Sequence, residues 1–191
     1  MCRVPIVQVF AAIVALLAAA CPPVSGQEAA PPEPDGYRQD NYRAPTPAGL
    51  KDARTVTTEE AAVLWRNKVL FVDVMPQAPR PANLPAGTIW RDKVRLSIPG
   101  STWLPDTGYG QLAATTEAYL ANALATLTGG DRSRSIVFFC MRDCWMSWNA
   151  AKRAVAWGYS QVIWFPDGTD GWEVADLPLE PAHPLPRPDN N

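Results

Sequence analysis

Apolar and polar residues are distributed along the chain in a pattern that predicts strands separated by helices. Residues 69–74 are apolar apart from Asp73. Such a continuous run is typical of a strand that is covered on both faces of a parallel sheet. Shorter apolar runs predict further strands at residues 88–90, 101–104, 136–139 and 161–165.

Three segments between these strands have the pattern of helices. They span approximately residues 57–67, 115–127 and 147–157. Thr57 and Glu60 have the spacing of a capping box, Thr115 or Thr116 can cap the second helix, and glycines follow the second and third. Because helices separate the strands, the pattern predicts an α/β fold of three layers, with a central, mainly parallel β-sheet flanked by helices.

The amino-terminal residues predict an export signal. Arg3 precedes an apolar run over residues 4–20, and the small residues 24–26 follow as a cleavage site. We therefore expect residues 1–26 to be removed, and the protein to be exported. The apolar run barely reaches the length of a membrane span, so no stable span is expected after cleavage. Lipid attachment at Cys21 is the alternative.

Composition divides the rest of the chain into three parts. Residues 27–53 form a Pro-rich extended arm, residues 54–180 form one domain, and residues 181–191 form a Pro-rich tail. The only histidine, His183, lies in that tail, so a mechanism that depends on histidine is not expected. The formal net charge is −2, and the sequence has no stripe of basic residues. Both features argue against a nucleic-acid partner.

Only two cysteines remain once the export signal is removed. Cys140 directly follows the predicted strand 136–139, and Cys144 comes four residues later at the start of a helix. Ligand sites of open α/β sheets lie at the carboxyl ends of strands, and a helix N-terminus favours a thiolate. Arg142 adds positive charge. The pair could form a disulfide, act as a redox couple, or combine one reactive thiol with a guard.

The residues around the two cysteines are the candidates for substrate binding: Met141, Arg142, Asp143, Trp145, Met146 and Ser147. Trp145 and Trp148, if exposed, would anchor a partner protein or a flat cofactor, and core packing is the alternative. Ser147 is expected to cap the helix, since no base accompanies it as a nucleophile. Lys152 and Arg153 are expected on a solvated face, and the alternative is that either points back toward the cysteine loop. Two cysteines and a distant histidine do not complete a zinc site, and neither a metal nor a cofactor is expected.

Residues 54–179 resemble a rhodanese-type domain. The likeness rests on "VLFVDV", an apolar strand with Asp73 near its end, on "IPGSTWLP", on the strand, Cys140, loop and helix, and on the closing "GYSQVIWFPDGTDGW". The resemblance implies a structural role for Asp73. It also implies that the Cys140 thiolate attacks a sulfane sulfur, becomes a persulfide, and passes that sulfur to an acceptor thiol or cyanide.

The cysteine loop departs from the pattern of that family. Typical members have an arginine five residues after the cysteine and then a serine, whereas here Trp145 and Met146 occupy those positions. This chain therefore lacks the arginine that usually binds thiosulfate in that family. The related phosphatases need an arginine six residues after the cysteine, where this chain has Met146. The rival function is thiol–disulfide exchange between Cys140 and Cys144, although their spacing differs from the two-residue gap of thioredoxin-like proteins.

A narrower resemblance covers nearly the whole chain after the export signal. "CMRDCWMSWNAAKRA", together with "NYRAP", "LPAGTIWRDK" and "LPDTGYG", is similar to a small rhodanese-like family associated with pyrroloquinoline quinone (PQQ)-dependent catabolism and named for its CXXCW motif. Here three residues separate the cysteines. The resemblance implies a periplasmic setting beside quinoprotein alcohol oxidation. The expected partners are a small sulfur donor or acceptor thiol and a periplasmic quinoprotein dehydrogenase or cytochrome. A binding role without catalysis is the third alternative.

Overall fold

The structure is a computed structural model that describes residues 29–187, so the predicted export signal and Cys21 lie outside it. No helix in that range has both the length and the apolar character needed to cross a membrane. The elements follow in the order β1 (Arg54–Thr55), α1 (Thr58–Arg66), β2 (Leu70–Asp73), β3 (Arg95–Ser97), β4 (Thr102–Trp103), α2 (Ala114–Thr128), β5 (Ile136–Phe139), α3 (Trp145–Ala156), β6 (Val162–Phe165), α4 (Gly168–Val174) and β7 (Glu180–Ala182).

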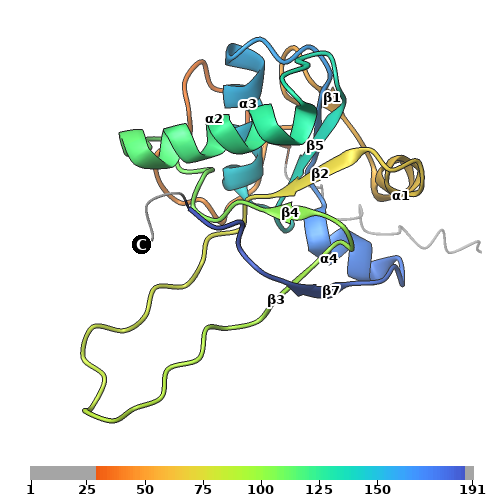
Figure 1. The fold of residues 1–191 in the computed structure, drawn as a ribbon. Helices are drawn as coiled ribbons and strands as arrows, with labels where there is room; N and C mark the ends of the chain where they lie inside the picture. Colours follow the sequence, from red (N-terminus) through yellow and green to blue (C-terminus); the bar gives the residue numbers. More distant parts are fainter. Residues whose placement is uncertain (1–28, 188–191) are drawn as a thin grey trace, which may run out of the picture.

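A parallel sheet forms the centre of the molecule (Figure 1). It has five strands, in the order β1-β6-β5-β2-β4. Strand β5 lies in the middle and pairs with β6 on one side and β2 on the other. The register aligns Asp73 with Phe139, and Phe139 with Phe165. The three strands therefore end at the same edge of the sheet. The predicted α/β fold with a central parallel sheet is confirmed.

Alternate residues of the central strands enter two separate hydrophobic cores. In β5, Ile136 and Phe138 pack with α2 and α3 on one face, whereas Val137 and Phe139 pack with α1 and α4 on the other. All four side chains are fully buried. Because side chains of a strand point alternately to its two faces, an uninterrupted apolar run is the pattern that this arrangement requires.

Helix α1 starts as the sequence pattern predicts, whereas α2 and α3 start at other residues than predicted. Helix α1 has the predicted capping box, in which Thr57 Oγ1 accepts from the Glu60 N–H and Glu60 Oε2 accepts from the Thr57 N–H. Helix α2 begins after Ala113, which has no capping side chain, and not at the predicted threonines. Helix α3 begins at Trp145, with Cys144 in the N-cap position and no side-chain capping bond, so the prediction of Ser147 as the cap is wrong.

The structure has no strand at residues 88–90, so that prediction is wrong. This stretch belongs to a long Pro-rich loop, residues 76–94, that projects away from the body of the protein (Figure 1). The chain becomes a strand only at β3, which pairs antiparallel with β7 in a second, small sheet. The short helix α4 was not predicted, because its two glycines are typical of a turn.

Candidate functional site

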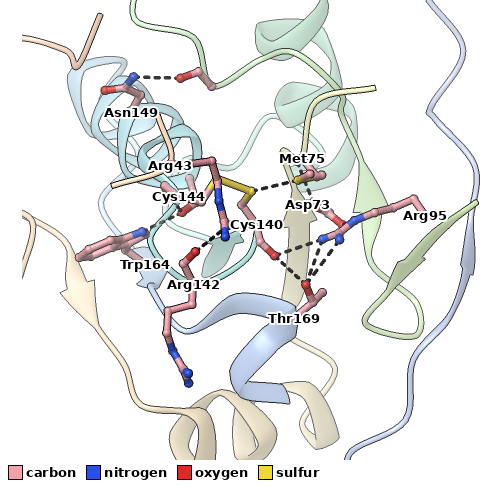
Figure 2. The surroundings of a disulfide bond; sticks show 12 residues. Arg43, Asp73, Met75, Arg95, Cys140, Arg142, Cys144, Asn149, Trp164 and Thr169 are labelled. Atoms are coloured by element: carbon pink, nitrogen blue, oxygen red, sulfur yellow. Dashed lines mark hydrogen bonds and ion pairs between the residues drawn. A yellow bond between two sulfur atoms is a disulfide. The ribbon is translucent and has the colours of Figure 1, made fainter. Parts of the chain in front are cut away.

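The two cysteines form a disulfide at the carboxyl end of the central strand. Cys140 directly follows β5, Cys144 occupies the N-cap position of α3, and their Cα atoms lie 6.3 Å apart (Figure 2). Between them, Asp143 has a φ of 54°, in the left-handed region, which lets the loop turn back into the helix. Both cysteines are buried, with 0% and 3% of their surfaces exposed. Of the three alternatives for the pair, the structure contains the disulfide.

The carbonyl group of Cys140 is held by three hydrogen bonds from outside its own loop. Thr169, in α4, donates to it from its backbone N–H at 3.1 Å and from its hydroxyl at 3.2 Å. Arg95 Nη2, from β3, donates to the same oxygen at 3.1 Å. Gly168 makes this approach of α4 feasible, because a Cβ there would lie 2.7 Å from the Cys140 carbonyl oxygen. The end of β5 is thus fixed before the cysteine loop begins.

Arg95 is held in turn by Asp73, at the end of the neighbouring strand. The Asp73 carboxylate is fully buried and accepts from Arg95 Nε at 2.8 Å and from the Ser97 hydroxyl at 2.6 Å (Figure 2). It also accepts from the Met75 N–H at 2.9 Å. These contacts suit the structural role that the resemblance implies for Asp73. Sequence reasoning missed Arg95, because β3 carries no strand pattern and lies 22 residues after Asp73.

Arg142 does not supply the positive charge that was expected beside Cys140. Its guanidinium is half exposed and lies 3.4 Å from an Asp167 carboxylate oxygen, turned away from the disulfide (Figure 2). The cation bound to the Cys140 residue is Arg95 instead, through the carbonyl oxygen. Asp143 is also exposed, whereas Met141 is half-buried and pairs as a β-bridge with Gly168.

The amino-terminal arm lies along the cysteine loop. Arg43 Nη1 donates to the Arg142 carbonyl at 2.8 Å, and the Ala44 N–H donates to the Asp143 carbonyl at 3.1 Å. The Tyr42 carbonyl accepts from the N–H of Trp145, the first residue of α3, at 2.9 Å. The arm therefore satisfies a helix amide that would otherwise be available to an anionic substrate. No sequence signal indicated that the arm reaches the site.

Trp145, Met146 and Ser147 lie beneath the loop and not at its surface. The three side chains are at most 3% exposed. Trp145 and Trp148 donate their ring N–H groups to arm carbonyls, those of Pro45 and Gly49. The prediction of core packing is therefore confirmed for both tryptophans, and the prediction of an exposed aromatic anchor is wrong. Ser147 donates to the Cys144 carbonyl and accepts from the ring N–H of Trp164.

The prediction of a solvated Arg153 is also wrong, because this side chain is buried. Its guanidinium donates to the carbonyls of Tyr109 and Gly110 at 3.1 and 3.0 Å, and the ring of Tyr37 lies 4.3 Å away. Burial lowers the pKa of Arg153. Lys152 is half-buried, with its ammonium donating to the Pro34 carbonyl. Both cations thus attach the arm and the loop before α2 to helix α3.

A cleft of about 420 Å³ opens beside the disulfide. Its wall includes Met75, whose Sδ lies 3.5 Å from Cys140 Sγ, and Met141 from the cysteine loop. Trp103, Arg95 and Thr169 also line it. Cys140 itself does not reach the cleft surface, because Met75 lies in between. Of the predicted substrate-binding residues, only Met141 faces this cleft.

Thiol chemistry is what this arrangement can perform. In the disulfide, Cys140 and Cys144 can be attacked by a thiolate, and after reduction Cys140 becomes a nucleophile next to a second thiol. Within residues 29–187, no group of three or more histidine, cysteine or acidic residues is placed to hold a metal ion.

Comparison with known proteins yields structural neighbours only. No protein-family model and no curated protein matches the chain. It is similar to a thiosulfate sulfurtransferase from Pseudomonas aeruginosa, at 18% identity and a TM-score of 0.46 over 69% of this chain, and it spans 21% of that structure's length. It is also similar to the polysulfide-sulfur transferase homodimer from Wolinella succinogenes, at 18% identity and a TM-score of 0.41, covering 73% of this chain and 83% of that one.

Proposed function

We propose that the protein transfers sulfane sulfur through a persulfide on Cys140, and that Cys144 then releases the sulfur. The observation that carries this proposal is the position of Cys144, close enough to bond Cys140 at the end of the central strand and beside a cleft. A persulfide formed on Cys140 would have the second thiol as its immediate neighbour. The resemblance of the sequence to a rhodanese-type domain supports the same chemistry.

The proposed reaction has two steps. The Cys140 thiolate attacks the outer sulfur of a small persulfide, RSSH, which forms a persulfide on Cys140 and leaves the thiolate RS⁻. The Cys144 thiolate then attacks the inner sulfur of that persulfide, which forms the Cys140–Cys144 disulfide and expels hydrosulfide, HS⁻. Two electrons from an external dithiol, or from two thiols, restore the reduced pair.

Burial of the sulfur atoms favours a small substrate over a protein. Cys140 is 0% exposed and Cys144 is 3% exposed, so a thiol held in a folded protein has no direct access to either sulfur. The cleft of about 420 Å³ falls within the range of about 300–1,000 Å³ that is typical of small-molecule sites. We therefore place a small sulfur donor or acceptor thiol in this cleft.

Thiol–disulfide exchange is the second candidate function, and the disulfide itself is the observation that favours it. In that case the pair would carry electrons between a reductant and an oxidised acceptor, with no sulfur atom transferred. Both candidates use Cys140 as the attacking or attacked sulfur. They differ only in whether an added sulfur ever appears on Cys140.

Intact mass spectrometry separates the two candidates. The reduced protein is exposed without oxygen to a small persulfide and, separately, to thiosulfate, and its mass is measured before and after cyanide. We expect Cys144→Ser to retain one added sulfur that cyanide removes, wild type to release sulfide and become the disulfide, and Cys140→Ser to gain nothing. If Cys140→Ser carries the same sulfur, or if no form gains sulfur, the sulfur-transfer proposal is wrong. Oxidation of the thiol pair without added sulfur would favour the redox function.

We also infer, from the export pattern and the narrower family resemblance, that the protein works in the periplasm beside a quinoprotein dehydrogenase or cytochrome. Cell fractionation and the intact mass of the exported protein test the first part. Loss of residues 1–26 is expected, whereas a lipid on Cys21 would replace cleavage after Gly26. Calorimetric titration with a PQQ-dependent alcohol dehydrogenase tests the second part, and the absence of any binding to the dehydrogenase or its cytochrome would contradict it.

A further inference from the structure

Met75 occupies the position from which a substrate would have to attack Cys140. Its Sδ lies 3.5 Å from Cys140 Sγ, on the side of Cys140 that faces away from Cys144 (Figure 2). A thiolate attacks a disulfide sulfur from the side opposite the sulfur that leaves. With Cys144 as the leaving sulfur, that approach to Cys140 coincides with the Met75 side chain.

Only the side chain of Met75 is free to move. Its backbone N–H donates to Asp73 at 2.9 Å, and its carbonyl accepts from the ring N–H of Trp103 at 2.6 Å. Both partners are buried. The side chain, by contrast, is half-buried and forms part of the cleft wall, and its unbranched thioether rotates easily. Rotation of this one side chain would connect the cleft to Cys140.

The charges along the cleft disfavour an anionic substrate. Four charged residues line it: Lys93, Arg95, Asp170 and Glu173. The charge of Arg95 is already neutralised by the buried Asp73 carboxylate. Among the ion pairs of residues 29–187, none involves the other three. The cleft wall therefore contains one cation, Lys93, and two acids, Asp170 and Glu173, outside any ion pair, which gives it a weak excess of negative charge.

The rest of the cleft wall is largely apolar: Met75, Val94, Leu96, Trp103, Met141 and Leu179. Such a wall suits a small aliphatic group, whereas a dianion such as thiosulfate would lose its hydration there without an excess of positive charge in return. The arm also disfavours an anion, because the first N–H of α3, that of Trp145, already donates to the Tyr42 carbonyl.

From these observations, we propose that the cleft binds small, apolar thiols or persulfides that are neutral or cationic, and that Met75 gates their access to Cys140. This inference deepens the proposed function and rests on it for the role of Cys140. In the gated step, the thiolate RS⁻ attacks Cys140 Sγ, a bond forms between the two sulfurs, and the Cys140–Cys144 bond breaks to leave the Cys144 thiolate. A second thiol then attacks the mixed disulfide, giving RSSR and the reduced pair.

Three thiols of similar size and different charge test the selectivity of the cleft: cysteamine, 2-mercaptoethanol and 3-mercaptopropionate. The rate of reduction of the oxidised protein is measured by alkylation and intact mass. Each rate is divided by the rate of the same thiol with bis(2-hydroxyethyl) disulfide, which removes differences in thiol reactivity. We expect the cationic and neutral thiols to exceed the anionic one by about three- to tenfold at low salt, and the difference to shrink at high salt.

Variants of the cleft provide the controls for charge. Asp170→Asn combined with Glu173→Gln should bring the normalised rate of 3-mercaptopropionate close to that of the neutral thiol. Equal normalised rates for all three thiols in the wild-type protein, or a fastest rate for the anion, would overturn the selectivity.

Met75 variants test the gate. Met75→Ala should accelerate reduction by all three thiols at least tenfold, whereas Met75→Leu, which preserves the bulk, should stay within about twofold of wild type. Leu179→Ala is the matched control, because Leu179 lines the same cleft but packs with the other hydrophobic core. Unchanged rates in Met75→Ala, or equal acceleration in Leu179→Ala, would overturn the gate.

The reduction assay is independent of sulfur transfer. It uses the oxidised protein and simple thiols, so it can succeed even if no persulfide ever forms on Cys140. Conversely, a persulfide on Cys140 with no charge selectivity and no effect of Met75 would leave the proposed function standing and reject this inference alone. Near-ultraviolet circular dichroism of each variant before reduction shows that the comparison is made between folded proteins.

Discussion

The ion pair between Asp73 and Arg95 is expected to be the most sensitive polar contact near the cysteines. In Asp73→Asn the side chain keeps its shape, but Arg95 loses the charge that compensates its own. The carboxylate is fully buried and the guanidinium is only 12% exposed, and they lie 2.8 Å apart. Removing one partner of such a buried pair costs about 3–5 kcal/mol, because an uncompensated charge stays behind.

The lower end of that range is the better expectation here. Arg95 retains hydrogen bonds to the Cys140 carbonyl and to Thr169 Oγ1 after the substitution. We therefore expect Asp73→Asn to lower the free energy of unfolding by about 3 kcal/mol. Urea unfolding of the oxidised protein measures this quantity, provided that the dependence on urea keeps the same slope in each variant.

Two further variants show whether the loss comes from the pair itself. The double variant Asp73→Asn with Arg95→Met should lose less stability than the sum of the two single variants, since no charge remains unpaired. Arg142→Gln breaks the half-exposed contact with Asp167 and should cost less than about 1 kcal/mol. The reasoning is refuted if Asp73→Asn costs no more than Arg142→Gln, or if the double variant loses the full sum.

Three other predictions concern Gly168 in α4, Tyr119 in α2 and the N-cap of α1. Gly168→Ala should destabilise the protein by about 2 kcal/mol more than Gly129→Ala: both positions have positive φ, but only at Gly168 would a Cβ clash, 2.7 Å from the Cys140 carbonyl. Urea unfolding of both variants measures the difference, and equal losses would contradict it. Burial raises the pKa of Tyr119 to about 12, above the value of about 10 in the unfolded chain. The protonated side chain therefore contributes stability that is fully present below the unfolded pKa and is lost as pH rises through the folded pKa. Between pH 9 and pH 11 the free energy of unfolding should therefore fall further in wild type than in Tyr119→Phe, and parallel curves would refute this assignment. Thr57→Ala removes the cap of α1 and should cost about 1 kcal/mol in the same unfolding assay, while a loss below about 0.3 kcal/mol would show that the capping box is not needed.

The amino-terminal arm restrains the cysteine loop and covers one side of it. Residues that precede the first strand form hydrogen bonds with the backbone of Arg142, Asp143 and Trp145, so the loop is held on both sides. Asn149 fixes the arm in place, since its side-chain amide exchanges two hydrogen bonds with the backbone of Arg38 at 2.9 Å each. Access to the disulfide from the side of the arm would require these contacts to break, which makes the cleft beside Met75 the easier route.

Local sequence patterns were sufficient to predict the elements that depend only on neighbouring residues. The apolar runs of β2, β5 and β6 predict buried parallel strands, and the capping box at Thr57 predicts the start of α1, because periodicity and capping act within a few residues. For the same reason Cys140 could be placed at the end of a strand and Cys144 at the start of a helix. Both expectations needed only the order of neighbouring residues.

The residues that surround the cysteines could be identified only from the packing of the folded chain. Met75 and Arg95 lie beside Cys140 because β2 is the neighbour of β5 and because the chain returns along β3 after a long loop. The burial of Trp145 and the route of the arm depend on the same packing. Contacts between residues 45–111 positions apart, such as those of Arg95 with Cys140 and of Arg38 with Asn149, follow from strand order and helix packing, and a pattern that repeats every two to four residues contains no information about either.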